Sequence, residues 1–279
     1  MLSLFSISLQ RIFTNGECIE IMKTVVLFVS HFINENYLKR YFKLVNDLAD
    51  LYDVYWLFQT DNGISDEPLR KQGVCVEGFT IEDLNTLNYS PIDEYFYGSE
   101  HFLDEIFFHH HPEYDFYWLI EYDVVFTGNW RVLFDAFHYN KADFLSSHIT
   151  FYDDCKDWRW WSSLSFNKKD KIESHKWVKS FNPIHRYSRS SLEFLDTYLQ
   201  REGNSGFSET LPVTGLYNNG FSIIDFGGTG RFVPSGYKNR FYRQSDENSN
   251  ETMRWRPEFS LEEIESIGLI NKLFHPVKE

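Results

Sequence analysis

The sequence predicts an α/β protein with a mostly parallel, twisted sheet and helices on both faces. An apolar, β-branched run at residues 24–30 is typical of a strand that is buried on both faces. Residues 34–51 carry an apolar stripe at helical spacing, and a second apolar run follows at 53–58. A strand, a helix and a strand at this spacing form the unit that joins parallel neighbours in a sheet. The 279 residues, of which 42% are apolar, are enough for one large domain.

The composition limits the classes of partner. With 41 acidic and 27 basic residues the formal charge is −14, which disfavours binding to nucleic acid. The aromatic content of 19% is high, and large rings fill cores but also line sugar and nucleobase sites. No run of about 18 apolar residues exists, so we expect no membrane span. Three cysteines without metal-like spacing suit a reducing compartment. We therefore expect a cytoplasmic protein, with peripheral attachment to a membrane left open.

The start of the chain is expected to lie outside the fold. The first 13 residues are apolar in patches, but no basic segment precedes them, so they make a poor signal peptide. The first predicted strand follows Met22 and Lys23 directly. We therefore predict an N-terminal extension at residues 1–21 and a single domain at 22–279.

Further elements are predicted up to residue 150. Thr80 and Ser99 are each expected to cap a helix, because a serine or threonine there can accept a hydrogen bond from a free backbone N–H. The most apolar segment, residues 116–126, predicts a buried strand. A helix is expected over about 130–137 and a short strand over 142–147.

The pattern weakens in the second half. Residues 151–182, rich in Trp, Lys and Asp, predict a long ordered loop or lid. The later expectations are a helix at 188–200, a helix opened by Ser208, a strand at 221–225 and an irregular polar stretch at 234–258. Ser260 and Glu263 match a capping box, which predicts a last helix.

The strongest candidate for chemistry is the triplet Glu121-Tyr122-Asp123, which lies in the most apolar segment. Carboxylates in such surroundings are costly unless they are paired or bind a cation. Residues two apart on a strand point to the same side, so both carboxylates could converge on one hard cation such as Mg²⁺ or Mn²⁺. The alternative is a structural pair that caps a neighbouring helix or binds Arg131.

These features resemble the GT-A family of nucleotide-sugar glycosyltransferases. Its layout is a strand–helix–strand start and then an apolar strand that ends in a DxD motif, in which Glu is a common first residue. The phrase Tyr-Asp-Phe-Tyr-Trp-Leu-Ile-Glu-Tyr-Asp-Val at residues 114–124 resembles a poorly characterised branch of this family. The terminal His-Pro-Val-Lys at 275–278 is similar to that branch too. The resemblance covers most of the chain and implies a GT-A-like, Rossmann-like fold.

The resemblance also implies a set of site residues. Asp123 would ligate Mn²⁺ or Mg²⁺, Glu121 would contact the donor ribose or the metal, and His275 would be a further ligand. The loops after the first two strands would hold the nucleobase and ribose, which puts Ser30 and Asp61 at the donor. For His275 the alternative is a surface position in a frayed tail.

Glu209 is the candidate general base. It lies beside a predicted helix start after a glycine break, and inverting members of the family need a carboxylate at a comparable place to deprotonate the acceptor hydroxyl. A retaining route needs no such base. The alternative is a first-turn glutamate that the helix dipole favours.

Three further groups are weaker candidates. We expect His109, His110 and His111 to form a solvated helix end, because neighbouring side chains on a helix diverge around its axis. The tryptophans at 158–161 could stack on a sugar or pack in a core or lid. A basic stretch could meet a diphosphate or be an ordinary surface loop; it comprises Lys238, Arg240 and Arg243.

The predicted function is metal-dependent transfer of a hexosyl group from a nucleotide-diphosphate sugar to an acceptor hydroxyl, in glycan or polysaccharide synthesis. Two alternatives stay open. A metal-dependent phosphoryl hydrolase could use the same acids, and a non-catalytic carbohydrate- or nucleotide-sugar-binding protein could keep the fold without turnover.

Overall fold

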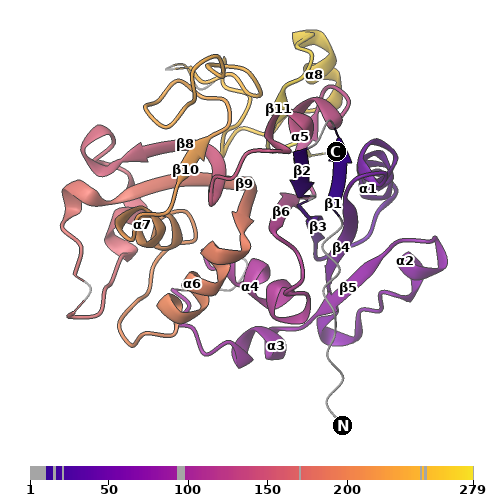
Figure 1. The fold of residues 1–279 in the computed structure, drawn as a ribbon. Coiled ribbons are helices and arrows are strands. Elements are labelled where there is room, and N and C mark those ends of the chain that lie inside the picture. The colour runs from indigo at the N-terminus through magenta and orange to yellow at the C-terminus, as the bar shows by residue number, and fades with distance from the viewer. Residues whose placement is uncertain are drawn as a thin grey trace.

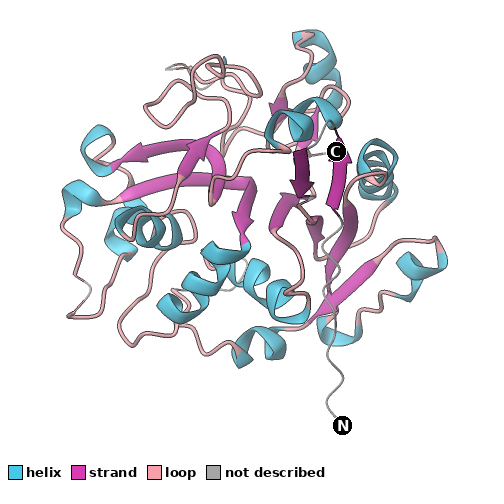
Figure 2. Ribbon diagram, viewed as in Figure 1, coloured by secondary structure: helices cyan, strands magenta, loops and turns pink. Residues whose placement is uncertain are grey.

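The computed structural model describes residues 11–14, 17–20, 22–92, 98–169, 171–245, 247 and 250–278. The first half forms β1 (Arg11–Thr14), β2 (Glu17–Glu20), β3 (Thr24–Ser30), α1 (Glu35–Leu48), β4 (Asp53–Gln59), α2 (Glu67–Lys71), β5 (Val76–Phe79), α3 (Ile81–Thr86), α4 (His101–His110), β6 (Phe116–Glu121), β7 (Val125–Phe126) and α5 (Arg131–Phe137). The second half forms β8 (Phe144–Phe151), β9 (Val178–Ser188), α6 (Arg189–Leu199), α7 (Leu211–Asn218), β10 (Ile223–Asp225), α8 (Leu261–Ile267) and β11 (Leu273–Phe274). Short 3₁₀ helices lie at Asp61–Gly63, Tyr152–Asp154, Arg159–Ser163 and Ser174–Lys176. Figure 2 shows how helices and strands alternate.

The predicted α/β class is confirmed. In the part of the chain that the structure describes, seven strands form the central sheet in the order β10-β8-β9-β6-β3-β4-β5 (Figure 1). β3, β4, β5 and β6 pair in parallel, and so do β8 and β10. Only β9 runs the other way, since it pairs antiparallel with both β6 and β8. The sheet is therefore mostly parallel.

Helices cover both faces of this sheet, as predicted. Along β3, Val26 and Phe28 enter one apolar core together with α1 and α5. The alternate residues Val25 and Leu27 enter a second core together with α3, α4, α6 and α7. Successive side chains of a strand point to opposite faces, which explains why β3 is apolar at every position. Figure 1 shows α4 and α6 side by side with α3 and α7 next to them. α1 and α5 pack in the first of the two cores.

Several predicted element boundaries are confirmed because local hydrogen bonds define them. The run at 24–30 is β3. The Asn34 side chain accepts the Tyr37 N–H at 2.8 Å and starts α1. Thr80 with Asp83, and likewise Ser260 with the glutamate three residues later, form complete capping boxes at α3 and α8.

The prediction of a loop over 151–182 was wrong in its last part, because β9 begins at Val178. Polar residues such as Lys179, Asn182 and Arg186 interrupt the apolar residues of this strand, so its pattern is neither continuous nor alternating. The strand is specified by its two neighbours in the sheet and not by a local signal. β8 is also longer than expected, reaching residue 151 through two irregularities in its pairing.

Three predicted starts and ends shift by a few residues. α4 begins after Glu100, and Ser99 does not cap it. α7 begins at Leu211, so Ser208 lies in a turn before the helix. The strand expected over 116–126 ends at Glu121, and after a turn the chain continues as β7, which pairs with β11.

The N-terminal segment contributes no strand to the central sheet within the described residues. β1 and β2 pair with each other in a separate two-stranded sheet. The rest of residues 1–21 lies outside the described residues, so the division at residue 22 stays a prediction, as does the cytoplasmic location. None of the described helices has the length and apolar character needed to cross a membrane.

Asp225, at the end of β10, forms hydrogen bonds with the irregular stretch that follows it. Its buried carboxylate accepts hydrogen bonds from the Gly227 and Gly228 N–H groups at 2.9 and 2.8 Å. It also accepts the Tyr242 hydroxyl, at 2.9 and 3.0 Å, and the Ile149 N–H at 3.1 Å. This one carboxylate therefore connects the turn after β10 and β8 to Tyr242 in the predicted irregular region.

Replacing that carboxylate should destabilise the protein. Asp225→Ala leaves buried donors without an acceptor, each costing about 1–3 kcal/mol, so the free energy of unfolding should fall by at least about 2 kcal/mol. Asp135→Ala, which removes an exposed partner of Arg131, should cost under about 1 kcal/mol. Urea unfolding compares the two variants, and equal losses would contradict this role of Asp225.

Candidate functional site

A cavity of about 620 Å³ opens at the carboxyl ends of β3 and β6. From β3 the sheet extends to β4 and β5 on one side, and from β6 it extends to β9 and β8 on the other. Such a point, where the strand order reverses, is where open α/β sheets bind ligands. The cavity is therefore the candidate functional site.

Glu121, Asp123 and His275 come together in the wall of this cavity. One ligand atom of each lies within 4.8 Å of the others. The His275 Nε2 atom is 3.6 Å from a Glu121 oxygen and 3.5 Å from Asp123 Oδ1. Two atoms that each bind one ion at about 2.1 Å lie up to about 4.2 Å apart, so this acid–histidine triad can share a cation with little rearrangement.

A hydrogen bond on the far side of the His275 ring leaves Nε2 as the ligand atom. The Nδ1 atom lies 2.9 Å from the carbonyl oxygen of Arg254, and only an Nδ1–H can donate to that oxygen. In the neutral ring Nε2 then carries the lone pair, and it faces the two carboxylates. Metal-binding histidines are commonly oriented by such a bond to a backbone carbonyl.

Asp123 supplies the evidence that these residues fit a cation. The residue is 5% exposed, and among the described residues its Oδ1 atom has no hydrogen-bond partner. A buried carboxylate oxygen without a donor is costly, and a cation bound there would remove that cost. Two carboxylate oxygens and one imidazole nitrogen suit Mn²⁺ or Mg²⁺, and the ligands do not choose between them.

The structure brings the predicted triad together, but not by the expected route. Asp123 lies in the turn after β6 and not on the strand, so the turn makes the two carboxylates converge. Arg131 does not bind either of them; it pairs with Asp50 and Asp135.

The segment that carries His275 is part of the fold and not a frayed tail. His275 is 6% exposed. Its N–H donates to the Thr252 carbonyl at 2.9 Å, and the Val277 N–H donates to the Asp123 carbonyl at 2.9 Å. The second of these bonds joins the segment directly to the turn that carries Asp123.

Lys278 is a site residue that the sequence analysis did not single out, although it belongs to the noted terminal motif. Its ammonium lies 3.2 Å from Asp123 Oδ2 and donates to the Tyr122 hydroxyl at 2.9 Å. Burial opposes its charge, but the bond to Tyr122 and the charge of Asp123 outweigh burial and raise the pKa of Lys278. Lys278 thus brings a fixed positive charge to the triad.

Glu209 lies in the cavity wall, in the turn before α7 and not in the first turn of a helix. Loss of hydration raises the pKa of Glu209 to about 8; Lys179 opposes the rise, while Glu100 and Glu121 reinforce it by repulsion. The backbone N–H of Asn182 lies 3.5 Å from its carboxylate. Glu209 is thus a carboxyl that ionises close to neutral pH beside the triad, as a general base requires.

Glu100 is a second acid in this wall that the sequence analysis missed. Its carboxylate accepts the Ser208 hydroxyl at 2.6 Å and the Gly98 N–H at 3.0 Å. Burial and the charge of Glu121 raise its pKa, against the effect of these bonds. The residue carries no motif, and it reaches the cavity because α4 starts there.

Aromatic side chains form another part of the wall. Trp160 stacks on Phe207, with ring centroids 4.3 Å apart and planes at 5°. The Arg159 guanidinium lies over Trp160, at 4.5 Å, and over Trp255, at 5.4 Å. Trp255 is 59% exposed, which leaves much of its surface available to a ligand. Trp158 also lines the cavity, whereas Trp161 is buried.

Of the two residues that the loops after the first two strands were expected to place at the donor, one lies at the cavity. Ser30 is in the wall, but its hydroxyl donates to the Phe32 carbonyl and accepts the Trp56 indole N–H, both at 2.9 Å. Asp61 is not among the residues that line the cavity. Its carboxylate accepts the Ile81 N–H at the start of α3, so it serves a structural bond there.

The basic loop lies outside the cavity as well. Lys238, Arg240 and Arg243 are not in its wall. Arg240 lies over the rings of two neighbouring aromatic residues, and Arg243 donates to a backbone carbonyl. Positive charge in the wall comes instead from Arg159, Lys179 and Lys278, and from the two arginines on either side of Trp255.

No protein-family model matches this sequence, and a search of curated proteins finds no match. Solved structures are similar at low sequence identity. The mannosyltransferase Ktr4p from S. cerevisiae is 14% identical, covering 74% of this chain and 68% of its own, with a TM-score of 0.38. The galactosyltransferase LgtC, solved with donor and acceptor sugar analogues, is 12% identical, covering 88% and 78%, with a TM-score of 0.39.

A third similar structure is not named as a glycosyltransferase. It is 4-diphosphocytidyl-2C-methyl-D-erythritol synthase from Anaerococcus prevotii, 9% identical over 77% of this chain and 92% of its own, with a TM-score of 0.41. At TM-scores of this size the likeness does not assign a reaction. The function must therefore be argued from the residues of the cavity.

Removing one charge from the triad should weaken metal binding. Asp123→Asn keeps the shape but loses an anionic ligand, so affinity for Mn²⁺ should fall at least about tenfold, as measured by titration calorimetry. Asp61→Asn is the matched control, since Asp61 lies outside the cavity wall, and it should bind Mn²⁺ like the wild type. Equal affinities for the wild type and Asp123→Asn would remove Asp123 from the site.

Proposed function

We propose that this protein is a metal-dependent glycosyltransferase that moves a hexosyl group from a nucleotide-diphosphate sugar to an acceptor hydroxyl, in glycan or polysaccharide synthesis. The observation that carries the proposal is the convergence of Glu121, Asp123 and His275 at the strand ends of a parallel sheet. The cavity volume of about 620 Å³ is in the range that small-molecule ligands occupy.

The positive groups of the site suit the diphosphate of the donor. A divalent ion on the triad would neutralise the charge that develops on the departing diphosphate. Lys278, beside Asp123, offers a second positive charge to the same group. His31 lies in the wall too, and burial together with the charge of Lys278 lowers its pKa against the effect of Asp123, so it adds no positive charge at neutral pH.

Glu209 is the proposed base of an inverting transfer. The acceptor oxygen bonds to the anomeric carbon of the donor sugar while the bond from that carbon to the diphosphate oxygen breaks. The hydroxyl proton passes to the Glu209 carboxylate. A carboxylate with a pKa of about 8 holds this proton more tightly than an ordinary glutamate does, which favours the transfer.

The aromatic wall favours a sugar acceptor over water. The ring faces of Trp255 and of the Trp160–Phe207 stack are large, flat apolar surfaces of the kind that sugar sites use. A phosphoryl hydrolase with the same triad would need only water as the acceptor, so it would not need rings to bind an acceptor sugar.

A donor screen tests the proposed function. The melting temperature should rise with one or a few nucleotide-diphosphate sugars, more strongly with Mn²⁺ than with a chelator, because specific binding stabilises the folded state. The donors found should then give glycoside products with sugar acceptors. Turnover of simple phosphodiesters without any transfer would instead show a hydrolase, and donor binding without turnover would show a binding protein.

If Glu209 is the base, its replacement should lower the rate of transfer without weakening donor binding. Glu209→Gln should lower kcat by about 10²–10⁴-fold while donor affinity stays near the wild-type value, because the base acts only in the transition state. Steady-state kinetics and calorimetry measure the two quantities. Normal turnover in this variant would contradict the assignment and leave the retaining route.

The same residue sets a pH dependence of known sign. Activity needs the ionised carboxylate, so kcat/KM of the wild type should rise with pH up to about 8. The folded state holds the proton more tightly than the unfolded chain, so the stability contributed by protonated Glu209 is present below pH 4.5 and is lost as pH rises to about 8. Over that range the stability of Glu209→Gln should therefore rise relative to that of the wild type, and denaturant unfolding at several pH values measures the difference.

Loss of the Lys278 charge should change the affinities for the metal and for the donor in opposite directions. Lys278→Met removes a positive charge 3.2 Å from Asp123, so Mn²⁺ alone should bind more tightly. The donor diphosphate should bind at least about tenfold more weakly, because it loses a charge-assisted partner. Lys238→Met, in the basic loop outside the cavity, is the control and should change neither affinity. A parallel loss of both affinities would show that Lys278 only supports the fold.

A further inference from the structure

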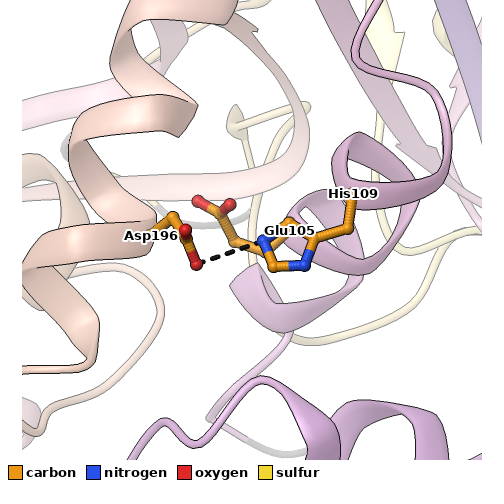
Figure 3. A group of neighbouring side chains, drawn as sticks. All are labelled: Glu105, His109 and Asp196. Carbon is orange, nitrogen blue, oxygen red and sulfur yellow. Dashed lines mark ion pairs between the residues drawn. The ribbon is translucent and has the colours of Figure 1, made fainter.

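A second cluster of metal-binding side chain types lies between α4 and α6. Glu105 and His109 are four residues apart on α4 and therefore share a face of that helix. Asp196 comes from α6, and one ligand atom from each of the three residues lies within 4.8 Å of the others. Figure 3 shows the two carboxylates and the imidazole gathered between the helices. None of the three residues lines the cavity that holds the acid–histidine triad.

The Glu105 carboxylate has no partner of its own. The residue is 1% exposed, and neither carboxylate oxygen accepts a hydrogen bond from any residue that the structure describes. Burial raises the pKa of Glu105 well above its ordinary value, and the charges of Asp196 and Asp104 raise it further. A proton or a cation bound to this group would therefore remove the free-energy cost of burying its charge.

The other two residues are held in place and reachable from solvent. One Asp196 oxygen accepts the Tyr89 hydroxyl at 2.6 Å and the Gln200 amide at 3.1 Å, and the His109 Nε2 atom lies 3.1 Å from it. The side chains of His109 and Asp196 are 36% and 28% exposed. Two of the three side chains are thus partly exposed to solvent, and hydrogen bonds already orient the Asp196 carboxylate.

Of the three adjacent histidines, His109 and His110 end α4 and His111 follows it, and the expected divergence holds only for His109. His110 and His111 both face Glu77, at 2.8 and 3.4 Å. Only His109 faces α6. The run of three histidines is therefore not one site, but one member of it joins the Glu105 carboxylate.

We propose that Glu105, His109 and Asp196 bind a divalent transition-metal ion, with Zn²⁺ as the best match. One imidazole nitrogen and two carboxylate oxygens form a ligand set that Zn²⁺ accepts, with a fourth position left for water. The ion would replace the partner that Glu105 lacks. It would also join α4 to α6.

Such an ion would act on the cavity through α4. Glu100 and His101 at the start of this helix lie in the cavity wall, and Glu105 follows about one turn later. Cross-linking α4 to α6 would hold that wall in place. The proposal does not depend on the reaction proposed for the cavity, because it rests on other residues.

Counting bound ions on the full chain tests this site. After equilibrium dialysis against Zn²⁺, Glu105→Gln and His109→Gln should each hold one ion fewer per chain than the wild type. His110→Gln, the same change one residue further along α4, is the matched control and should keep the wild-type number. Each comparison is repeated with Asp123→Asn in the background, so that ions on the triad are counted separately.

Melting temperatures show that the variants are folded. Glu105→Gln removes an unpartnered carboxylate and keeps its shape, so without metal it should melt no lower than the wild type. The rise in melting temperature that Zn²⁺ gives the wild type should shrink in both variants and stay in His110→Gln. If Glu105→Gln and His109→Gln hold as many Zn²⁺ ions as the wild type and show the same rise, a proton satisfies Glu105 and the proposal is overturned.

Discussion

Two carboxylates and an imidazole that meet in a largely buried place need a positive partner, and the site of this protein is arranged around that requirement. Glu121 ends the central strand β6 and Asp123 lies in the turn after it, while His275 comes from the far end of the chain. The backbone hydrogen bond from Val277 to Asp123 and the pairing of β11 with β7 keep them together. Lys278 offsets part of the negative charge without satisfying Asp123 Oδ1. A cation there would complete the site.

The sequence predicts the elements whose boundaries depend on neighbouring residues. β3 is apolar throughout because both of its faces are buried, and Asn34 and Thr80 cap the helices that they precede. β9 could not be predicted, since its place between β6 and β8 comes from long-range pairing. Asp61 was assigned to the donor from its position after a strand, but its carboxylate binds the start of α3.

The site residues also differ in whether a local sequence signal predicts them or only the fold brings them together. Glu121 and Asp123 could be predicted because two acids in an apolar segment are costly in any fold. His275 followed only from a family resemblance, and Glu100 carries no local signal. For the second cluster, the spacing of Glu105 and His109 on one helix is visible in the sequence, yet Asp196 becomes their neighbour only when α4 packs against α6.

The most direct test of the central claim is pulsed electron paramagnetic resonance of bound Mn²⁺. It is made on the His109→Gln variant, so that the second cluster cannot supply the nitrogen ligand. We expect coupling to one imidazole nitrogen, which disappears when His275 is also changed to Gln. Phosphorus coupling should appear when a nucleotide-diphosphate sugar is added. A spectrum of fully hydrated Mn²⁺, with neither coupling, would contradict the account.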